Sequence, residues 1–174
     1  MKRFMMLLIF FLMGCESSEH YTMPSRSNCP RVQVIRDESY LTQFVNYEET
    51  FQISIVGYEG YCHYNSSVER YQGIIRPIFK IRKIRPSDET DVRFSYYTET
   101  ARGPIEYLGK KTYYVTAHIA SDAIETEYKA PAVRVYIPDT MLYDYDINLG
   151  LWISPEEAKY NRRTFDVDYS LIGR

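Results

Sequence analysis

The three cysteines, Cys15, Cys29 and Cys62, carry the most reactive side chains of this 174-residue chain. A thiol can be acylated, form a disulfide, ligate a metal or act as a nucleophile. His63 follows Cys62 directly, and a neighbouring imidazole is the group that activates a thiol for nucleophilic attack. Each cysteine must therefore be assigned one of these roles before a function can be inferred.

Catalytic and metal-binding roles find little support in the rest of the sequence. His20, His63 and His118 show no zinc-like spacing with the cysteines. The chain contains no G-x-S-x-G, H-E-x-x-H or G-x-x-x-x-G-K-[ST] motif. Residues 144–155 begin like a calcium loop but lack the glycine and the glutamate that an EF-hand requires. The sequence therefore predicts no metal, no cofactor and no catalytic residues, and the chain is not expected to be an enzyme.

Cys15 follows a short apolar segment that is preceded by two basic residues. Lys2 and Arg3 precede ten uninterrupted apolar residues, 4–13, and Gly14 offers a small side chain just before the cysteine. Ten helical residues rise only about 15 Å, about half of a hydrocarbon core of roughly 30 Å. The segment is therefore expected to be the apolar core of a secretory leader, and not a transmembrane helix.

The four residues Leu12-Met13-Gly14-Cys15 resemble the lipobox of bacterial lipoproteins. That resemblance implies a diacylglyceryl group on the Cys15 sulfur, cleavage before Cys15 and acylation of the new amino terminus. Residues 1–14 are then a signal peptide and 15–28 a lipidated tether, which is polar and lacks apolar periodicity. Two acyl chains already anchor a protein stably, and three would do so effectively permanently. By resemblance to enterobacterial sorting rules, Glu16 after the cysteine favours the outer membrane, with the domain facing the periplasm.

Cys29 and Cys62 remain as an even pair in an oxidising compartment, which predicts a disulfide. The bridge would close a loop of about 34 residues and contribute roughly 3 to 4 kcal/mol in the chain-entropy model. Two free thiols or a metal site are the alternatives. Neither cysteine lies in a C-x-x-C motif, so a structural role is expected instead of a redox role.

Charge argues against nucleic acid as a partner. The formal net charge of the chain is −2, and it becomes more negative when Lys2 and Arg3 leave with the leader. Phosphate contacts need a basic field.

Residues 29–174 have the composition of a single β domain. Seven segments rich in β-branched and aromatic residues predict strands. They are 31–35, 50–56, 73–84, 92–97, 111–120, 132–137 and 144–153. Gly57, Gly60, Gly73 and several prolines are interpreted as turns between them.

Short strands without long helical segments predict an all-β, antiparallel β-sandwich of immunoglobulin- or fibronectin-like type. A small lipocalin-type barrel is the alternative. Pro77 removes a backbone donor from its strand, which should lie at an edge or bulge there. Ser154-Pro155-Glu156-Glu157 is typical of a helix start and predicts one short C-terminal helix that ends near Arg163.

Two groups of side chains are candidates for an interaction surface. Lys80, Arg82, Lys83 and Arg85 lie in a strand segment without acidic residues, which fits either a solvated strand edge or a contact with lipid headgroups or an acidic partner. Tyr96 and Tyr97 belong to a chain with 18 tyrosines. They fit either buried rings or an exposed interface.

Short motifs over most of residues 29–174 resemble a family of small alphaproteobacterial lipoproteins with no assigned biochemical role. They are Cys29-Pro30, Leu41-Thr42-Gln43-Phe44, Gly57 with Cys62, Tyr114-Val115 with Ala117, and Tyr160-Asn161-Arg162. The resemblance implies an envelope lipoprotein with a cysteine pair and a β-rich domain, and implies no catalytic residues.

The sequence as a whole therefore predicts a non-enzymatic lipoprotein, held at the membrane by its lipid anchor, whose domain binds another envelope protein or has a structural role. A lipoprotein that binds lipid or glycan, through a barrel cavity or an aromatic surface, is the alternative.

Overall fold

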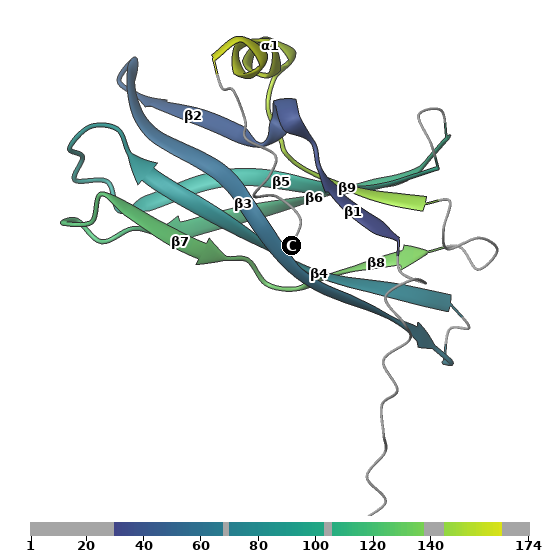
Figure 1. The fold of residues 1–174 in the computed structure, drawn as a ribbon. Coiled ribbons are helices and arrows are strands. Elements are labelled where there is room, and N and C mark those ends of the chain that lie inside the picture. Colours follow the sequence, from purple (N-terminus) through teal and green to yellow (C-terminus); the bar gives the residue numbers. More distant parts are fainter. Residues whose placement is uncertain (1–29, 68–69, 103–105, 138–144, 165–174) are drawn as a thin grey trace, which may run out of the picture.

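A computed structural model describes residues 30–67, 70–102, 106–137 and 145–164 of the chain. These residues form two packed β-sheets with one α-helix across one end (Figure 1). The first sheet has the order β1 (Arg31–Val34), β9 (Tyr145–Leu151), β5 (Asp91–Arg102), β6 (Glu106–His118). The second has the order β2 (Tyr40–Val45), β3 (Glu48–Asn65), β4 (Arg70–Lys83), β7 (Glu125–Lys129), and β8 (Val133–Ile137) also pairs with β4.

The core lies between the two sheets and is built by strand alternation. Inward side chains such as Ile53 on β3 and Leu149 on β9 are completely buried. Phe79 of β4 packs against Phe94 and Tyr96 of β5, with ring centroids 5.0 and 5.2 Å apart. The expected all-β sandwich with one short C-terminal helix is therefore confirmed.

The strand connections give this sandwich its particular order. β2, β3 and β4 are consecutive antiparallel neighbours, a meander, whereas immunoglobulin domains use Greek-key connections. β1 runs parallel to β9, and all other strand pairs among the described residues are antiparallel.

The glycines interpreted as turns lie inside strands, so that interpretation was wrong. Gly57 and Gly60 are in β3, and Gly73 is in β4. β3 is 18 residues long because it bends and continues, with a register shift between Ile55 and Gly57. A bulge of this kind lets a strand curve without ending.

Pro77 lies where β4 changes partner. β7 pairs with residues 78–82 of β4 and β8 pairs with residues 71–75, so Pro77 falls between the two partners. On its other side it pairs with Tyr58, next to the register shift of β3. The expectation of an edge or bulge at this proline is confirmed.

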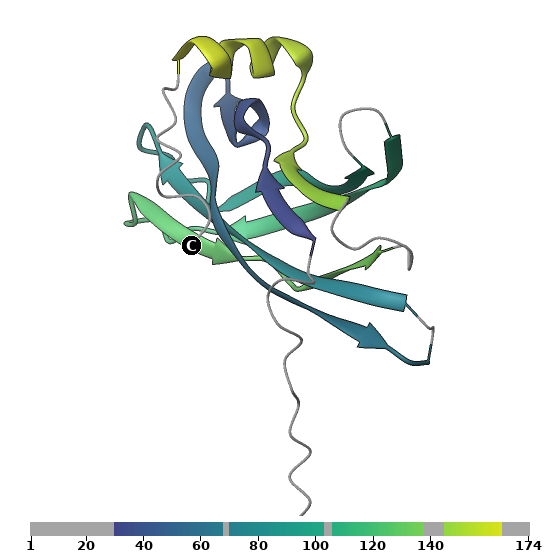
Figure 2. The same cartoon turned by 45° about the vertical axis from the view of Figure 1, so that its right-hand side comes forward.

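Helix α1 (Pro155–Thr164) begins at the predicted capping box. The Glu157 backbone N–H donates to the Ser154 hydroxyl at 3.2 Å, and the Ser154 N–H donates to the Glu157 carboxylate at 2.6 Å. Figure 2 shows the helix lying across one end of the sandwich. It covers the short 3-10 helix η2 (Arg36–Glu38), where Arg162 pairs with Asp37 at 3.3 Å.

Candidate functional site

A groove of about 820 Å³ opens between β2 and the start of β5. We call it the β2–β5 groove. Its walls come from both sheets, since β2 belongs to one and β5 to the other, and helix α1 contributes Glu157 at one end. The lining residues are Leu41, Thr42, Gln43, Phe44, Val45, Phe51, Asp88, Glu89, Thr90, Asp91, Arg93 and Glu157.

One wall of the groove is the outer edge of β2. β2 is the first strand of its sheet, so only one of its edges pairs with β3. The Ser39 carbonyl accepts a hydrogen bond from the Ile55 N–H of β3. The backbone N–H and C=O groups of successive strand residues point to opposite edges of the strand. Those of Tyr40 and Thr42 therefore point away from β3. The Tyr40 carbonyl accepts a 2.8 Å hydrogen bond from the Asn161 amide of helix α1. The helix therefore covers the beginning of this edge, and the groove begins at Thr42.

The opposite wall is the first part of β5. β9 pairs with β5 only over residues 96–102, and one further hydrogen bond joins the Trp152 N–H to the Ser95 carbonyl. By the same alternation, the backbone groups of Arg93 point toward the groove. The Arg93 carbonyl accepts a 2.5 Å hydrogen bond from the Gln43 side chain. A single glutamine thus bridges two strand edges that no described strand joins.

The groove combines an apolar floor with an acidic rim. Leu41 and Val45 pack against the core, and the Phe44 side chain is 59% exposed. The rim carries four carboxylates and one guanidinium. These charged residues are Asp88, Glu89, Asp91, Glu157 and Arg93. The site therefore offers a negative potential around an apolar surface.

Lys83 holds the loop that forms the acidic rim. Its ammonium donates to the carbonyls of Ser87, Ala120 and Ser121 at 3.3, 3.1 and 3.0 Å. The side chain is buried and makes three charge-assisted bonds. Lys83 thereby ties the β4–β5 loop to the β6–β7 loop and fixes the position of Asp88 and Glu89.

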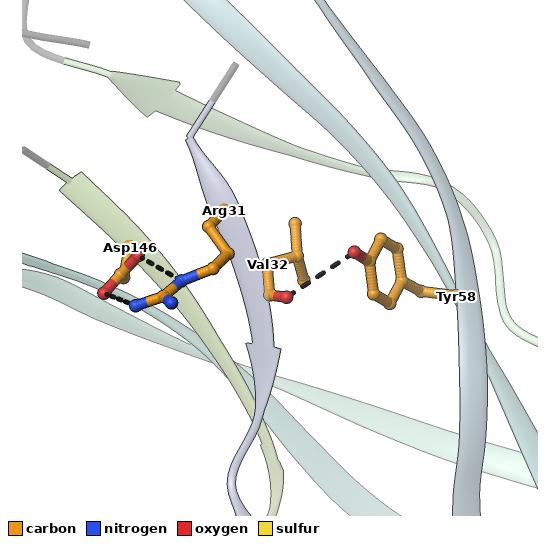
Figure 3. A network of polar contacts seen from close by, with 4 residues as sticks. All are labelled: Arg31, Val32, Tyr58 and Asp146. Carbon is orange, nitrogen blue, oxygen red and sulfur yellow. Dashed lines mark hydrogen bonds and ion pairs between the residues drawn. The ribbon is translucent and has the colours of Figure 1, made fainter. Parts of the chain in front are cut away.

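The same side of the sandwich is closed where β1 pairs with β9 (Figure 3). Arg31 donates to both carboxylate oxygens of Asp146 at 3.2 and 3.1 Å, and this hydrogen-bonded carboxylate raises the pKa of the Arg31 guanidinium. The Tyr58 hydroxyl of β3 donates to the Val32 carbonyl at 3.5 Å, which brings the second sheet against β1. On this side of the sandwich the edges of the two sheets meet, and we call this border the seam. The part at β1 and β9 is its closed half, and the β2–β5 groove is its open half.

The predicted interaction residues do not form one surface. Lys80 pairs with Glu125 at 3.0 Å and Arg85 with Glu48 at 3.1 Å, and Arg82 is exposed. None of these three residues lines the groove.

Lys83, Tyr96 and Tyr97 must be removed from the predicted surface. Lys83 is 8% exposed, Tyr96 2% and Tyr97 4%. Lys83 points inward because it follows the alternation of Phe79 and Ile81, and Tyr96 stacks on Tyr113 in the core. Burial raises the pKa of the Tyr96 phenol far above its usual range.

A second group of polar and aromatic side chains covers the outer face of the first sheet. The Tyr97 ring lies over Gly150, where an added Cβ would meet its hydroxyl at 2.7 Å. The Tyr97 hydroxyl donates to the Glu38 carboxylate. Lys110 places its ammonium 3.4 Å from the Tyr97 ring centroid and 5.0 Å from that of Trp152, which is 56% exposed. Trp152 is thus an accessible ring held beside a cation.

The cysteines are only partly within the described residues. Cys62 on β3 is buried, and its sulfur takes part in a disulfide. Cys15 and Cys29 lie outside the described residues, as do the predicted signal peptide and tether. Cys29 comes two residues before β1 in the sequence. The pairing itself stays a prediction.

The histidines do not assemble a reactive site in the described part of the chain. His118 Nδ1 lies 3.1 Å from an oxygen of Asp91, and both side chains are largely exposed. The described residues contain no group of three or more histidine, cysteine, aspartate or glutamate side chains that could hold a metal ion. No helix among them is long and apolar enough to cross a membrane.

Comparisons of the chain with protein-family models, with curated proteins and with solved structures found no match. The resemblance to small alphaproteobacterial lipoproteins therefore stays a prediction.

The sequence reasoning named none of the groove residues as a site, although Leu41-Thr42-Gln43-Phe44 were among the motifs of the resemblance. Strand β2 was not among the predicted strands, although Tyr40, Leu41, Phe44 and Val45 are typical strand residues. A six-residue strand that begins five residues after Ile35 was hard to separate from the preceding one. The acidic run 88–91 was available as a signal, but its opposition to β2 depends on how the sheets pack.

Proposed function

We propose that this protein is a non-enzymatic, lipid-anchored envelope lipoprotein whose β-sandwich binds another envelope protein through the β2–β5 groove. The lipid anchor on Cys15 and the outer-membrane location are supported by the leader and the lipobox-like residues 12–15. The binding role is supported by the groove, in which two strand edges face each other across an apolar floor.

The observation that carries the proposal is a pair of strand edges, at Thr42 and Arg93, with which no strand of the described residues pairs. Folded β proteins usually shorten, charge or cover an edge strand, because its free N–H and C=O groups recruit other strands. Here no strand among the described residues pairs with the edge of β2 at Thr42 or with the edge of β5 at Arg93, whose carbonyl is bound only by the Gln43 side chain, and the exposed Phe44 lies beside them. Such a surface favours protein binding by strand addition.

Site-specific crosslinking in the native membrane tests this proposal. Phe44 is replaced by a photoreactive phenylalanine analogue, and Tyr114, which is 87% exposed on the edge strand β6, receives the same replacement as the control. We expect one discrete protein adduct at position 44 that position 114 does not give. The adduct should disappear when Asp88→Lys and Glu89→Lys are added. Equal adducts at both positions, or none at position 44, would contradict a binding role for the groove.

Mass spectrometry of the processed protein tests the anchor separately. We expect an amino-terminal residue 15 that carries acyl chains. An unmodified thiol at residue 15, or a different amino terminus, would remove the basis for the proposed compartment.

A glycan-binding role is the second candidate, and Trp152 is the observation that favours it. Its exposed ring lies beside Lys110, and the Asn148 amide donates to the Glu99 carboxylate at 3.2 Å on the neighbouring strands. An exposed aromatic ring with amide and carboxylate groups nearby suits stacking on a sugar ring. Saturable quenching of the single tryptophan by envelope glycans, together with loss of glycan binding by Trp152→Ala in isothermal titration calorimetry, would support this role.

A further inference from the structure

We infer that the ligand of the β2–β5 groove is an extended protein segment in which apolar and basic side chains alternate, bound as an added strand between β2 and β5. The inference rests on the proposed function and specifies the partner: an unfolded, cationic stretch of another protein. It is carried by three independent features of the groove, namely its width, its alternating chemistry and its charge.

The width of the groove fits one strand. Neighbouring strands lie about 4.8 Å apart, so two strands that flank a third are about 10 Å apart. Gln43 spans the groove with its extended side chain, roughly 5 Å long, and a 2.5 Å hydrogen bond to the Arg93 carbonyl. Placed end to end, the side chain, the hydrogen bond and the carbonyl reach at most about two strand spacings, so the gap is no wider than one added strand needs. The Gln43 amide donates to the carbonyl that a backbone N–H of an added strand would bind, and such a strand would displace it.

The backbone groups on both sides are aligned for strand addition. Thr42 points its N–H and C=O into the groove from β2, and Arg93 does so from β5. β2 runs parallel to β4, because each is antiparallel to β3, and the loop after β4 reverses the chain into β5 (Figure 1). An added strand would therefore be antiparallel to one wall and parallel to the other.

The two faces of the groove demand different side chains. Residues of an added strand would point alternately inward, onto Leu41, Val45 and Phe51, and outward, toward solvent and the rim. The inward positions must be apolar, because the floor packs on the hydrophobic core. This alternation selects an extended ligand in which apolar side chains recur at every second residue, and not a helix or a folded surface.

Charge selects the outward side chains. The rim carries four carboxylates against the single guanidinium of Arg93. A ligand with lysine or arginine at its outward positions would be attracted, and an acidic ligand would be repelled. Two of these carboxylates, those of Asp88 and Glu89, lie on the loop that Lys83 fixes by its three hydrogen bonds, so the rim is held in place before a ligand binds.

Peptide binding to the full chain, purified from membranes in detergent, tests the inference. The probe is a labelled nine-residue peptide that alternates valine and lysine. One control alternates valine and glutamate, and the other contains the valines and lysines in two separate blocks. Fluorescence anisotropy should show at least tenfold tighter binding of the alternating basic peptide than of either control.

Matched variants locate the binding. Thr42→Pro removes an outward N–H from an edge strand, a position where proline is tolerated, and should weaken binding at least tenfold. Thr112→Pro is the control, because the Thr112 backbone N–H points outward from the edge strand β6 opposite Tyr97, beyond the part of β5 that lines the groove. The pair Asp88→Lys and Glu89→Lys should abolish the preference for the basic peptide. Glu125→Lys with Glu127→Lys on β7 should leave it unchanged. The charge variants keep the test decisive if Thr42→Pro fails to fold.

Three outcomes would overturn the inference. If the three peptides bind equally or not at all while Phe44 still gives a groove-dependent adduct in membranes, the groove binds a protein of another kind and only the proposed function stands. If Phe44 in the isolated chain crosslinks to the chain's own residues 165–174, the groove is filled from within. Loss of both the adduct and the peptide binding would refute the proposed function as well.

Discussion

The closed and the open half of the seam differ in how the edges of the two sheets are joined. In the closed half, β1 pairs with β9, Arg31 binds Asp146 with two hydrogen bonds, and Tyr58 joins the second sheet to β1. In the open half, β2 and β5 face each other and one Gln43 side chain spans the distance. The change occurs at η2, where the chain leaves the first sheet and enters the second.

The two halves lie on either side of the connection from β1 to β2, and we expect the closed half to determine stability and the open half to determine binding. The closed half buries completely inaccessible side chains of β9, whereas the open half exposes Phe44 and leaves Thr42 facing a groove. Substitutions in the closed half should therefore change the free energy of unfolding. Substitutions in the open half should change ligand binding with little effect on folding.

The largest expected effect comes from Leu149→Ala in the closed half. The Leu149 side chain is fully buried, and deletion of such a side chain costs about 2–5 kcal/mol through lost transfer energy and a residual cavity. Phe44→Ala in the open half should change stability by less than about 0.5 kcal/mol. Urea unfolding of both variants measures the contrast, and similar losses would remove the distinction between the two halves.

Lys83→Met should have the next largest effect, because it acts on the wall of the open half. The substitution removes the donor of three part-buried hydrogen bonds, which should cost about 1–3 kcal/mol. Lys80→Met, at an exposed ion pair with Glu125, should cost at most about 1 kcal/mol. Amide exchange should also speed up in the loop 84–90 of the Lys83 variant alone. An equal response of the two variants would argue against the fixed rim.

Ser154→Ala should destabilise the helix at the end of the open half by about 1 kcal/mol, because the capping hydroxyl is lost. Helix α1 holds the Tyr40 carbonyl through Asn161, so the exchange of β2 amides should rise as the helix frays. Ser66→Ala in an exposed turn is the control. Helix loss without any change in β2 would mean that α1 does not support the groove.

The smallest effect at neutral pH is expected for Tyr96→Phe, at the strand position where the closed half begins. Burial raises the pKa of the Tyr96 phenol in the folded state. The stabilisation is therefore complete below the unfolded pKa of about 10 and is lost as the pH rises above it. Tyr96→Phe should reduce the loss of stability between about pH 10 and 12, whereas the exposed Tyr114→Phe should not. Thermal unfolding across this range makes the comparison, and parallel curves for wild type and Tyr96→Phe would contradict it.

The sequence predicted those features that depend on local patterns. Alternating apolar residues predicted most strands, and Ser154 with Glu157 predicted the helix start, because both signals act over a few residues. Gly57 and Gly60 misled the interpretation because a bulged strand tolerates glycine as readily as a turn does. The burial of Tyr96 and Lys83 depended on which face of each strand met the other sheet.

The groove could not be predicted from local sequence patterns, for a different reason. Thr42 and Arg93 become a site only because β2 joins the second sheet while β5 extends past the end of β9. Gln43 and Arg93 are 50 residues apart in the chain. Sequence periodicity reports which face of a strand is apolar, but not which edge lacks a partner.

Pro77 has a consequence for how the molecule behaves at high concentration. It splits the outer neighbour of β4 into two pieces, β7 and β8, each only five residues long. A continuous strand there would present a long row of backbone groups on which further copies could stack into a fibril. Because that outer row is broken between β7 and β8, the sandwich can keep one edge open for recognition while its opposite border resists self-assembly.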